Sequence, residues 1–223
     1  MAMSGKLKLG LIAFVLVDLM LAVTFVSLYR VQSDREFTEE LRTLGITMYP
    51  EARVVEAFDL ADEQGESFRE TQLRGRWNFI FFGFTSCPDI CPLTMTELKQ
   101  FYEGLEESER NLLRVVMVSV DPARDNIETL GKYVNSFNED FVGLTGNAET
   151  ISAVARQFFV AHSKPEEASH NNHITTADTT DYIIEHSGHL AIIDPEGKFA
   201  AVMQSPMRDE DIAEAYRNLV ANY

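Results

Sequence analysis

Two continuous apolar runs stand out in the second third of the chain. Residues 79–82 read FIFF and are followed by Gly83-Phe84, and residues 114–120 read RVVMVSV. Four to eight apolar residues without polar alternation are typical of a strand that is buried on both faces, as in a parallel sheet covered by helices. The two runs therefore predict central strands, over residues 77–84 and 114–120.

Segments with helical spacing lie between and after these runs. Leu98, Phe101, Tyr102 and Leu105 follow the i, i+3, i+4, i+7 pattern and predict a helix over residues 92–107. Further helices are predicted at 126–138, from Asn147 to about residue 158, and at 209–221. Shorter strands are predicted at 54–60, 141–144, 182–184, 190–193 and 199–203, the last two forming a hairpin around the DPEG turn at 194–197.

The order of these elements predicts an α/β fold. Strands alternate with helices, and a hairpin and a last helix follow, which indicates a thioredoxin-like mixed sheet flanked by helices. We expect three parts: residues 1–30 with an N-terminal transmembrane helix, a polar stalk over 31–52, and a single domain over 53–223. The polar stretch 164–180 predicts an irregular loop.

The N-terminal part predicts a membrane anchor. Residues 9–29 are apolar except for Asp18, and about 20 apolar residues suffice to cross a bilayer as a helix. Lys6 and Lys8 precede the segment, which predicts a cytoplasmic N-terminus and an exported remainder. A cleavable signal peptide is the alternative, but its apolar core is normally shorter. The net charge of −16 argues against nucleic-acid binding, which requires a basic face.

The two cysteines of the chain, Cys87 and Cys91, lie where the first central strand ends and a helix begins. We expect the helix from about Pro92 and, because a helix N-terminus stabilises a thiolate, a lowered cysteine pKa. Any disulfide within the chain must join these two residues. A purely structural disulfide would close too short a loop to add much stability. The C-x-x-x-C spacing allows either a redox dithiol or two soft thiolates directed at one metal ion.

The chain has five histidines, and His186 lies in the most informative position. It follows a predicted strand and precedes the hairpin, a segment that lies beside the dithiol in a thioredoxin-like topology. Two sulfurs and an imidazole suit Cu(I) and tolerate Cu(II), but spacing alone leaves this role of His186 open. His170 and His173 lie in the polar loop. Either the loop is simply solvated or the two histidines bind a metal ion together, and the sequence is compatible with both. His162 and His189 are expected to be capping, packed or exposed residues.

Three motifs together resemble the Sco/SenC family, the membrane-anchored copper proteins of cytochrome c oxidase assembly. They are GFTSCPDICP at 83–92, SVDPARD at 119–125, and His186-Ser187 ahead of IDPEG at 193–197. The resemblance covers residues 54–223 and implies a thioredoxin-like fold with copper ligands at Cys87, Cys91 and His186. Two positions depart from the usual family pattern, which often has Asp where Glu185 stands and His where Ser86 stands. They alter the surroundings of the ligands and leave the ligands in place.

The resemblance implies a single-pass protein of the inner membrane whose C-terminal domain lies in the periplasm. It implies a copper chaperone for the binuclear copper centre, with the copper-bearing subunit of cytochrome c oxidase as its partner. Other periplasmic copper chaperones or thiol oxidoreductases are further expected partners. Two alternatives stay open: a thiol–disulfide reductase that acts on the oxidase cysteines or on other exported proteins, and a copper or redox sensor.

Overall fold

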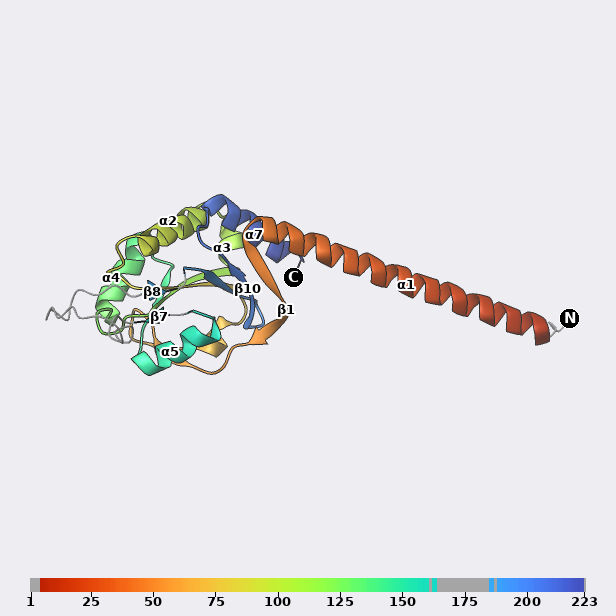
Figure 1. Ribbon diagram of the computed structural model, residues 1–223, viewed down its shortest axis with the longest axis horizontal. Helices are drawn as coiled ribbons and strands as arrows, with labels where there is room; N and C mark the ends of the chain where they lie inside the picture. The colour runs from red at the N-terminus through yellow and green to blue at the C-terminus, as the bar shows by residue number, and fades with distance from the viewer. Residues whose placement is uncertain (1–4, 161, 164–184, 187, 223) are drawn as a thin grey trace, which may run out of the picture. The chain divides into compact units, whose positions relative to one another are not determined.

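The computed structural model describes residues 5–160, 162–163, 185–186 and 188–222 (Figure 1). The chain divides into two compact units, Met1–Leu41 and Arg42–Tyr223. Helix α1 (Gly5–Thr43) accounts for the described part of the first unit. Within the described residues it is the one helix that has the length and apolar composition to cross a bilayer. The structure therefore agrees with the helical segment predicted at 9–29.

The second unit is built around a six-stranded mixed sheet with the order β1-β10-β9-β4-β5-β6. Its strands are β1 (Ile46–Val54), β4 (Trp77–Gly83), β5 (Leu113–Ser119), β6 (Val142–Leu144), β9 (Leu190–Ile193) and β10 (Lys198–Met203). Strands β4, β5 and β6 are parallel, whereas β9, β10 and β1 join by antiparallel pairing. Every residue of β4 is buried, as expected for a central strand with helices on both faces.

Helices α2 (Ile90–Glu103), α4 (Ile127–Phe137) and α7 (Asp209–Asn222) cover one face of the sheet, and α5 (Ala148–Gln157) covers the other (Figure 1). Phe79 of β4 packs against Phe101 of α2 and Tyr216 of α7, with ring centroids 5.7 and 5.9 Å away. Phe82 points to the opposite face and contacts Phe158, just after α5, at 5.6 Å. The alternation of side chains along β4 thus supplies both halves of the core.

Shorter elements complete the fold. The hairpin β2 (Asp59–Ala61) and β3 (Ser67–Arg69) leads into the 3₁₀ helix η1 (Glu70–Leu73), and α3 (Glu107–Arg110) precedes β5. Two-residue strands β7 (His162–Ser163) and β8 (Glu185–His186) pair with each other.

Most predicted elements are confirmed, with small shifts at their ends. The single strand predicted at 54–60 is wrong, because β1 ends at Val54, residues 55–58 form no strand, and β2 begins at Asp59. The central strands appear as β4 and β5, the C-terminal hairpin as β9 and β10, and Asn147 caps α5 by accepting a 2.8 Å hydrogen bond from the Thr150 amide. Residues 46–52, which we assigned to the stalk, belong instead to β1, which pairs with β10. His162 lies in β7, after the end of α5, and so does not cap that helix. The strand predicted at 182–184 and the histidines at 170 and 173 lie outside the described residues.

Candidate metal centre

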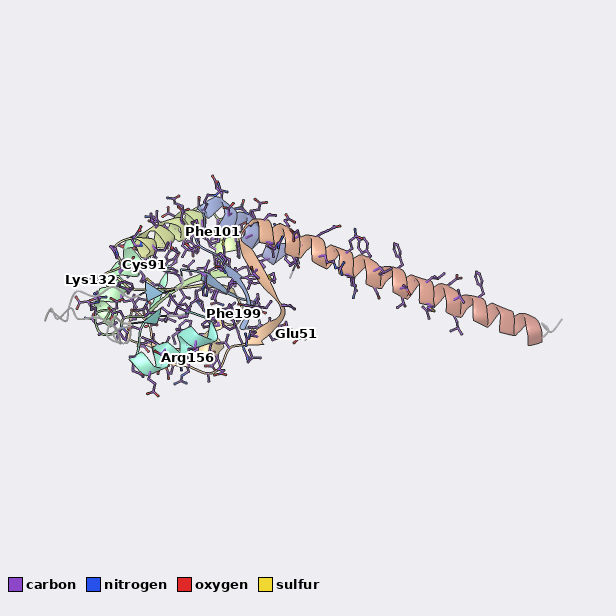
Figure 2. The ribbon with its side chains drawn as sticks, viewed as in Figure 1. Glu51, Cys91, Phe101, Lys132, Arg156 and Phe199 are labelled. Atoms are coloured by element: carbon purple, nitrogen blue, oxygen red, sulfur yellow. The ribbon has the colours of Figure 1, made fainter. Side chains whose placement is uncertain are left out.

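Cys87 lies on the short turn that joins β4 to α2, and Cys91 lies in the first turn of α2. The Cys87 amide donates a 3.2 Å hydrogen bond to the Phe84 carbonyl, which closes the turn, and the Cys87 side chain is partly exposed. Cys91 is the second residue of α2 (Figure 2). Its side chain is fully buried. Helix α2 therefore begins at Ile90, two residues earlier than predicted, and includes Cys91 in its first turn.

The absence of a side chain at Gly83 makes room for the Cys91 sulfur. A Cβ placed on Gly83 would lie 2.9 Å from Cys91 Sγ and 2.7 Å from the Phe81 ring, closer than carbon atoms approach in proteins. The same Cβ would lie 3.2 Å from the Met117 methyl group. The end of β4 therefore holds the Cys91 thiol in a tightly packed, apolar site.

The two cysteines are present as thiols, and a hydrogen bond joins their side chains. Burial raises the pKa of the Cys91 thiol, a backbone hydrogen bond with Phe84 lowers it, and the neighbouring Cys87 and Asp125 raise it further. For Cys91 the expectation of a lowered pKa is therefore wrong. The helix N-terminus favours the thiolate, but the loss of hydration on burial outweighs this effect. The Cys91 thiol is protonated at neutral pH until a metal ion or an oxidant displaces the proton.

A buried carboxylate, Asp125, fixes the turn that precedes Cys87. It accepts a 3.0 Å hydrogen bond from the Thr85 amide and a 2.5 Å hydrogen bond from the Thr85 hydroxyl. The hydroxyl of Ser119, the last residue of β5, donates a third bond of 2.6 Å to the same carboxylate. Asp125 thus connects β5 and the start of α4 to the dithiol turn.

A second buried carboxylate, Asp121, forms an ion pair with Arg124, whose guanidinium also lies 5.4 Å above the Phe84 ring. Both carboxylates belong to the SVDPARD motif that carries part of the family resemblance. The sequence analysis assigned this motif no role. Its signal was the occurrence of two acids within five residues of the end of a strand predicted to be buried, where a carboxylate requires partners.

His186 lies in β8, opposite His162 in β7. The side chains of both residues lie outside the described part of the structure, but the backbone after His186 is placed by Gly188. A Cβ on Gly188 would lie 3.5 Å from Cγ1 of Ile90, the residue directly before Cys91. Two residues after His186, the chain therefore passes next to the dithiol turn.

His189 has a structural role. Its side chain is buried, and its Nε2 lies 2.9 Å from the Phe158 carbonyl oxygen. Among the side chains that the structure describes, no three His, Cys, Asp or Glu residues form a cluster suited to a metal ion. The copper-ligand role of Cys87, Cys91 and His186 stays a prediction.

A thioredoxin-like domain with a dithiol between its central strand and the following helix defines the class to which this protein belongs. Comparison with known proteins specifies it further. The sequence profile of the SCO1/SenC family matches residues 47–221, and the chain belongs to this family. The SCO2-like protein RT0576 of Rickettsia typhi is 32% identical over 166 residues, which cover 74% of this chain and 77% of that protein.

Two solved structures extend the comparison. Arabidopsis thaliana ScoI with copper bound superposes with a TM-score of 0.65 at 28% identity, covering 75% of this chain and 99% of that one. Yeast Sco1 with copper bound superposes with a TM-score of 0.66 at 26% identity, covering 77% of this chain and 90% of that one. Both share the mixed sheet with flanking helices described above. The thioredoxin-like fold predicted from the sequence is confirmed.

Proposed function

We propose that this protein is a membrane-anchored copper chaperone that binds one copper ion through Cys87, Cys91 and His186. The observation that carries the proposal is the pair of hydrogen-bonded thiols on the turn after β4. Two neighbouring thiols can act together on one soft ion, and thiolates are the protein ligands that select Cu(I). Two relatives of known structure, Arabidopsis ScoI and yeast Sco1, contain bound copper.

The third ligand in this proposal is the imidazole of His186. Gly188, two residues after His186, lies next to Ile90, and this proximity of the chain to the dithiol supports the proposed role of His186. A third ligand on a segment separate from the dithiol gives the site one donor that can leave first. Such an arrangement suits a protein that must release its metal ion as well as bind it.

The proposed receiver is the copper-bearing subunit of cytochrome c oxidase, at its binuclear copper centre. Helix α1 would anchor the protein in the inner membrane, with the domain in the periplasm, as Lys6 and Lys8 indicate. Other periplasmic copper chaperones or thiol oxidoreductases would supply copper or electrons. The negative charge of the chain favours encounter with basic partner surfaces.

A thiol–disulfide reductase is the second candidate, and one observation favours it. Cys87 is partly exposed whereas Cys91 is buried, an asymmetry that suits an attacking and a resolving thiol. The Cys87 thiolate would attack a substrate disulfide to form a mixed disulfide, which the Cys91 thiolate would then break. The substrate gains two electrons and two protons, and the Cys87–Cys91 disulfide forms. A copper or redox sensor would use the same residues and a signalling partner.

Transfer to the isolated copper subunit distinguishes these functions. The copper-loaded protein is mixed with the reduced, copper-free subunit, and the optical spectrum of the binuclear centre is followed. A chaperone forms the centre and loses its own copper. In a second arm, the copper-free dithiol form is mixed with the oxidised subunit. A reductase leaves the centre empty in the first arm but converts the oxidised subunit to its dithiol form in the second. A sensor does neither, and this result would contradict both proposals.

A further inference from the structure

A cavity of about 520 Å³ lies at the edge of the sheet opposite the dithiol. Cys87 follows the carboxyl end of β4, whereas Arg76 directly precedes β4 and Arg114 is the second residue of β5. The two strands are parallel, so their amino ends meet at one edge, and both arginines line the cavity there. Arg110, the last residue of α3, is the third arginine in its wall. Three elements therefore bring a guanidinium group to one cavity, away from the proposed copper site.

The three guanidinium groups lack an acidic partner within the described part of the chain. No ion pair between described side chains involves any of them. Arg114 donates its hydrogen bonds to neutral oxygens, one of them the Asn78 side-chain oxygen at 3.2 Å. Arg110 lies 5.9 Å above the Tyr102 ring, and its Nε is buried without a hydrogen-bond partner. A buried donor without a partner is unfavourable and rare in folded proteins.

The cavity wall is positive, although the chain as a whole is strongly negative. Burial lowers the pKa of the Arg114 guanidinium, and the positive charge of Arg76 lowers it further. Two carboxylates, Glu107 and Asp140, are the negative groups in the wall, so the arginines outnumber them. The chain carries 35 acidic and 19 basic residues, so the arginines are not left unpaired by a shortage of acids. An anion bound between them would relieve their mutual repulsion.

A doubly charged oxyanion suits this wall better than a singly charged one. The flat fork of a guanidinium group matches the oxygens of a phosphate or a carboxylate. A phosphate monoester carries close to two negative charges at pH 7 and has three free oxygens, so it can bind more than one arginine at once. A carboxylate carries one charge and would be opposed by Glu107 and Asp140. The sequence of charges in the wall therefore favours a phosphate.

The size of the cavity indicates that the phosphate belongs to a larger molecule. The volume of about 520 Å³ lies within the range of small-molecule sites and leaves space beside a phosphate group. The carboxylates of Glu107 and Asp140 can accept hydrogen bonds from hydroxyl groups in that space. Asp140 already accepts one such bond, at 3.2 Å from the Tyr102 hydroxyl.

We propose that the cavity lined by Arg76, Arg110 and Arg114 binds a small, hydroxyl-bearing phosphate monoester, with the guanidinium groups on its phosphate and the carboxylates of Glu107 and Asp140 on its hydroxyl groups. The site goes beyond the proposed copper function and does not depend on it, because it lies at the opposite edge of the sheet. A phospholipid headgroup shares the phosphate chemistry, but it is usually a diester with a single charge, and the test separates the two sources.

The test is calorimetric titration of the copper-free full chain, in detergent micelles, with glycerol 3-phosphate at constant ionic strength. Arg76→Gln and Arg110→Gln each remove one guanidinium group from the cavity. Arg74→Gln is the matched control, since Arg74 is exposed like Arg76 but lies outside the cavity wall, beside the β9–β10 turn. A Cβ placed on Gly197 of that turn would lie 3.0 Å from Arg74 Cγ. Arg114 is kept, because its hydrogen bonds also hold neighbouring backbone in place.

We expect saturable binding with the same Kd in the wild type and in Arg74→Gln. The Kd should rise roughly tenfold in Arg76→Gln and in Arg110→Gln, the usual effect of removing one hydrogen bond between charged groups. Acetate should bind at least tenfold more weakly than the ester. Urea unfolding without ligand confirms that each variant is folded, and Arg76→Gln, which changes an exposed side chain, should unfold like the wild type.

Two results would overturn the inference. The first is a wild-type chain that does not bind the ester, and the second is an equal Kd in all four proteins. Glycerophosphoethanolamine, a soluble diester with a lipid headgroup, is titrated in parallel, and a Kd equal to that of the monoester would overturn the assignment to a monoester. Copper binding of Arg76→Gln should match that of the wild type, so the failure of this site and the failure of the copper proposal are separate results.

Discussion

The Asp125 carboxylate accepts two hydrogen bonds from Thr85, one of 3.0 Å from the amide and one of 2.5 Å from the hydroxyl. Forty residues of chain separate the two. Their contact connects the loop after β5 to the turn that presents Cys87, and Ser119 adds a third bond from the end of β5. The geometry of the dithiol therefore depends on a buried carboxylate that binds neither sulfur.

Replacement of Asp125 by Ala should destabilise the domain and disorder the dithiol turn. The Thr85 amide and the Ser119 hydroxyl lose their acceptor in a buried site, which should lower the free energy of unfolding by about 3 kcal/mol. Urea denaturation measures this loss. Asp59→Ala is the control. Asp59 accepts hydrogen bonds from the Ser67 hydroxyl and the Arg69 guanidinium but is exposed, so its replacement should lower the free energy of unfolding much less. Equal losses in the two variants would contradict the assigned role of Asp125.

Replacement of Gly83 by Ala should displace the Cys91 sulfur. The new Cβ would lie 2.9 Å from Cys91 Sγ, and the surrounding core leaves little room for adjustment. We expect a loss of about 1–3 kcal/mol in the free energy of unfolding, the usual effect of overpacking, together with weaker copper binding. Gly188→Ala is the matched control, since its Cβ would meet Ile90 at an ordinary 3.5 Å. A Gly83→Ala protein with unchanged stability and copper affinity would contradict the packing described here.

The pKa of Cys91 is raised in the folded state, so the stability of the copper-free protein should fall as pH rises above the unfolded value. The unfolded thiol begins to lose its proton near pH 8.5, whereas the folded thiol keeps it, so deprotonation favours unfolding. Between about pH 8.5 and 10, Cys91 should contribute up to about 1.4 kcal/mol of lost stability per pH unit. Denaturant unfolding of the wild type and of Cys91→Ala across this range measures the effect. The free energy of unfolding should fall less steeply with pH in the variant than in the wild type.

The two thiols should react at very different rates with an alkylating reagent. Cys87 is partly exposed on the turn, whereas Cys91 is fully buried and its pKa is raised, so iodoacetamide should modify Cys87 first. Mass spectrometry of peptides after brief exposure measures the order. Prior modification of Cys91 would mean that the start of α2 opens in solution, and would contradict its burial.

The sequence predicts the core of this fold because its central strands are long apolar runs. Residues 79–82 could only be buried, and β4 is buried along its whole length. Strand β1 was missed, because residues 46–54 are polar and irregular and their strand conformation comes from pairing with β10. Such a long-range contact has no local signal. The start of α2 was placed too late because Pro92 was read as the first helical residue, although it occupies the third position.

At the site, the sequence predicted the position of the dithiol but not its electrostatics. The helix N-terminus favours a thiolate at Cys91, but the burial of the sulfur beside Gly83 removes water and raises the pKa of the thiol instead. Whether a residue near a helix end is buried depends on elements that are distant in the sequence. The role of Asp125 was missed for the same reason, since its carboxylate bonds residues of other elements.

The most direct test of the account is copper binding by the full chain in detergent, reduced and loaded without oxygen. Stoichiometry and affinity are compared among wild type, Cys87→Ser, His186→Ala and His170→Ala, the last being the control histidine. We predict one tightly bound copper ion per chain, its loss in Cys87→Ser, weakening in His186→Ala and no change in His170→Ala. A chain that binds no copper tightly, yet still reduces disulfides in the His186→Ala form, would contradict the chaperone and favour the reductase.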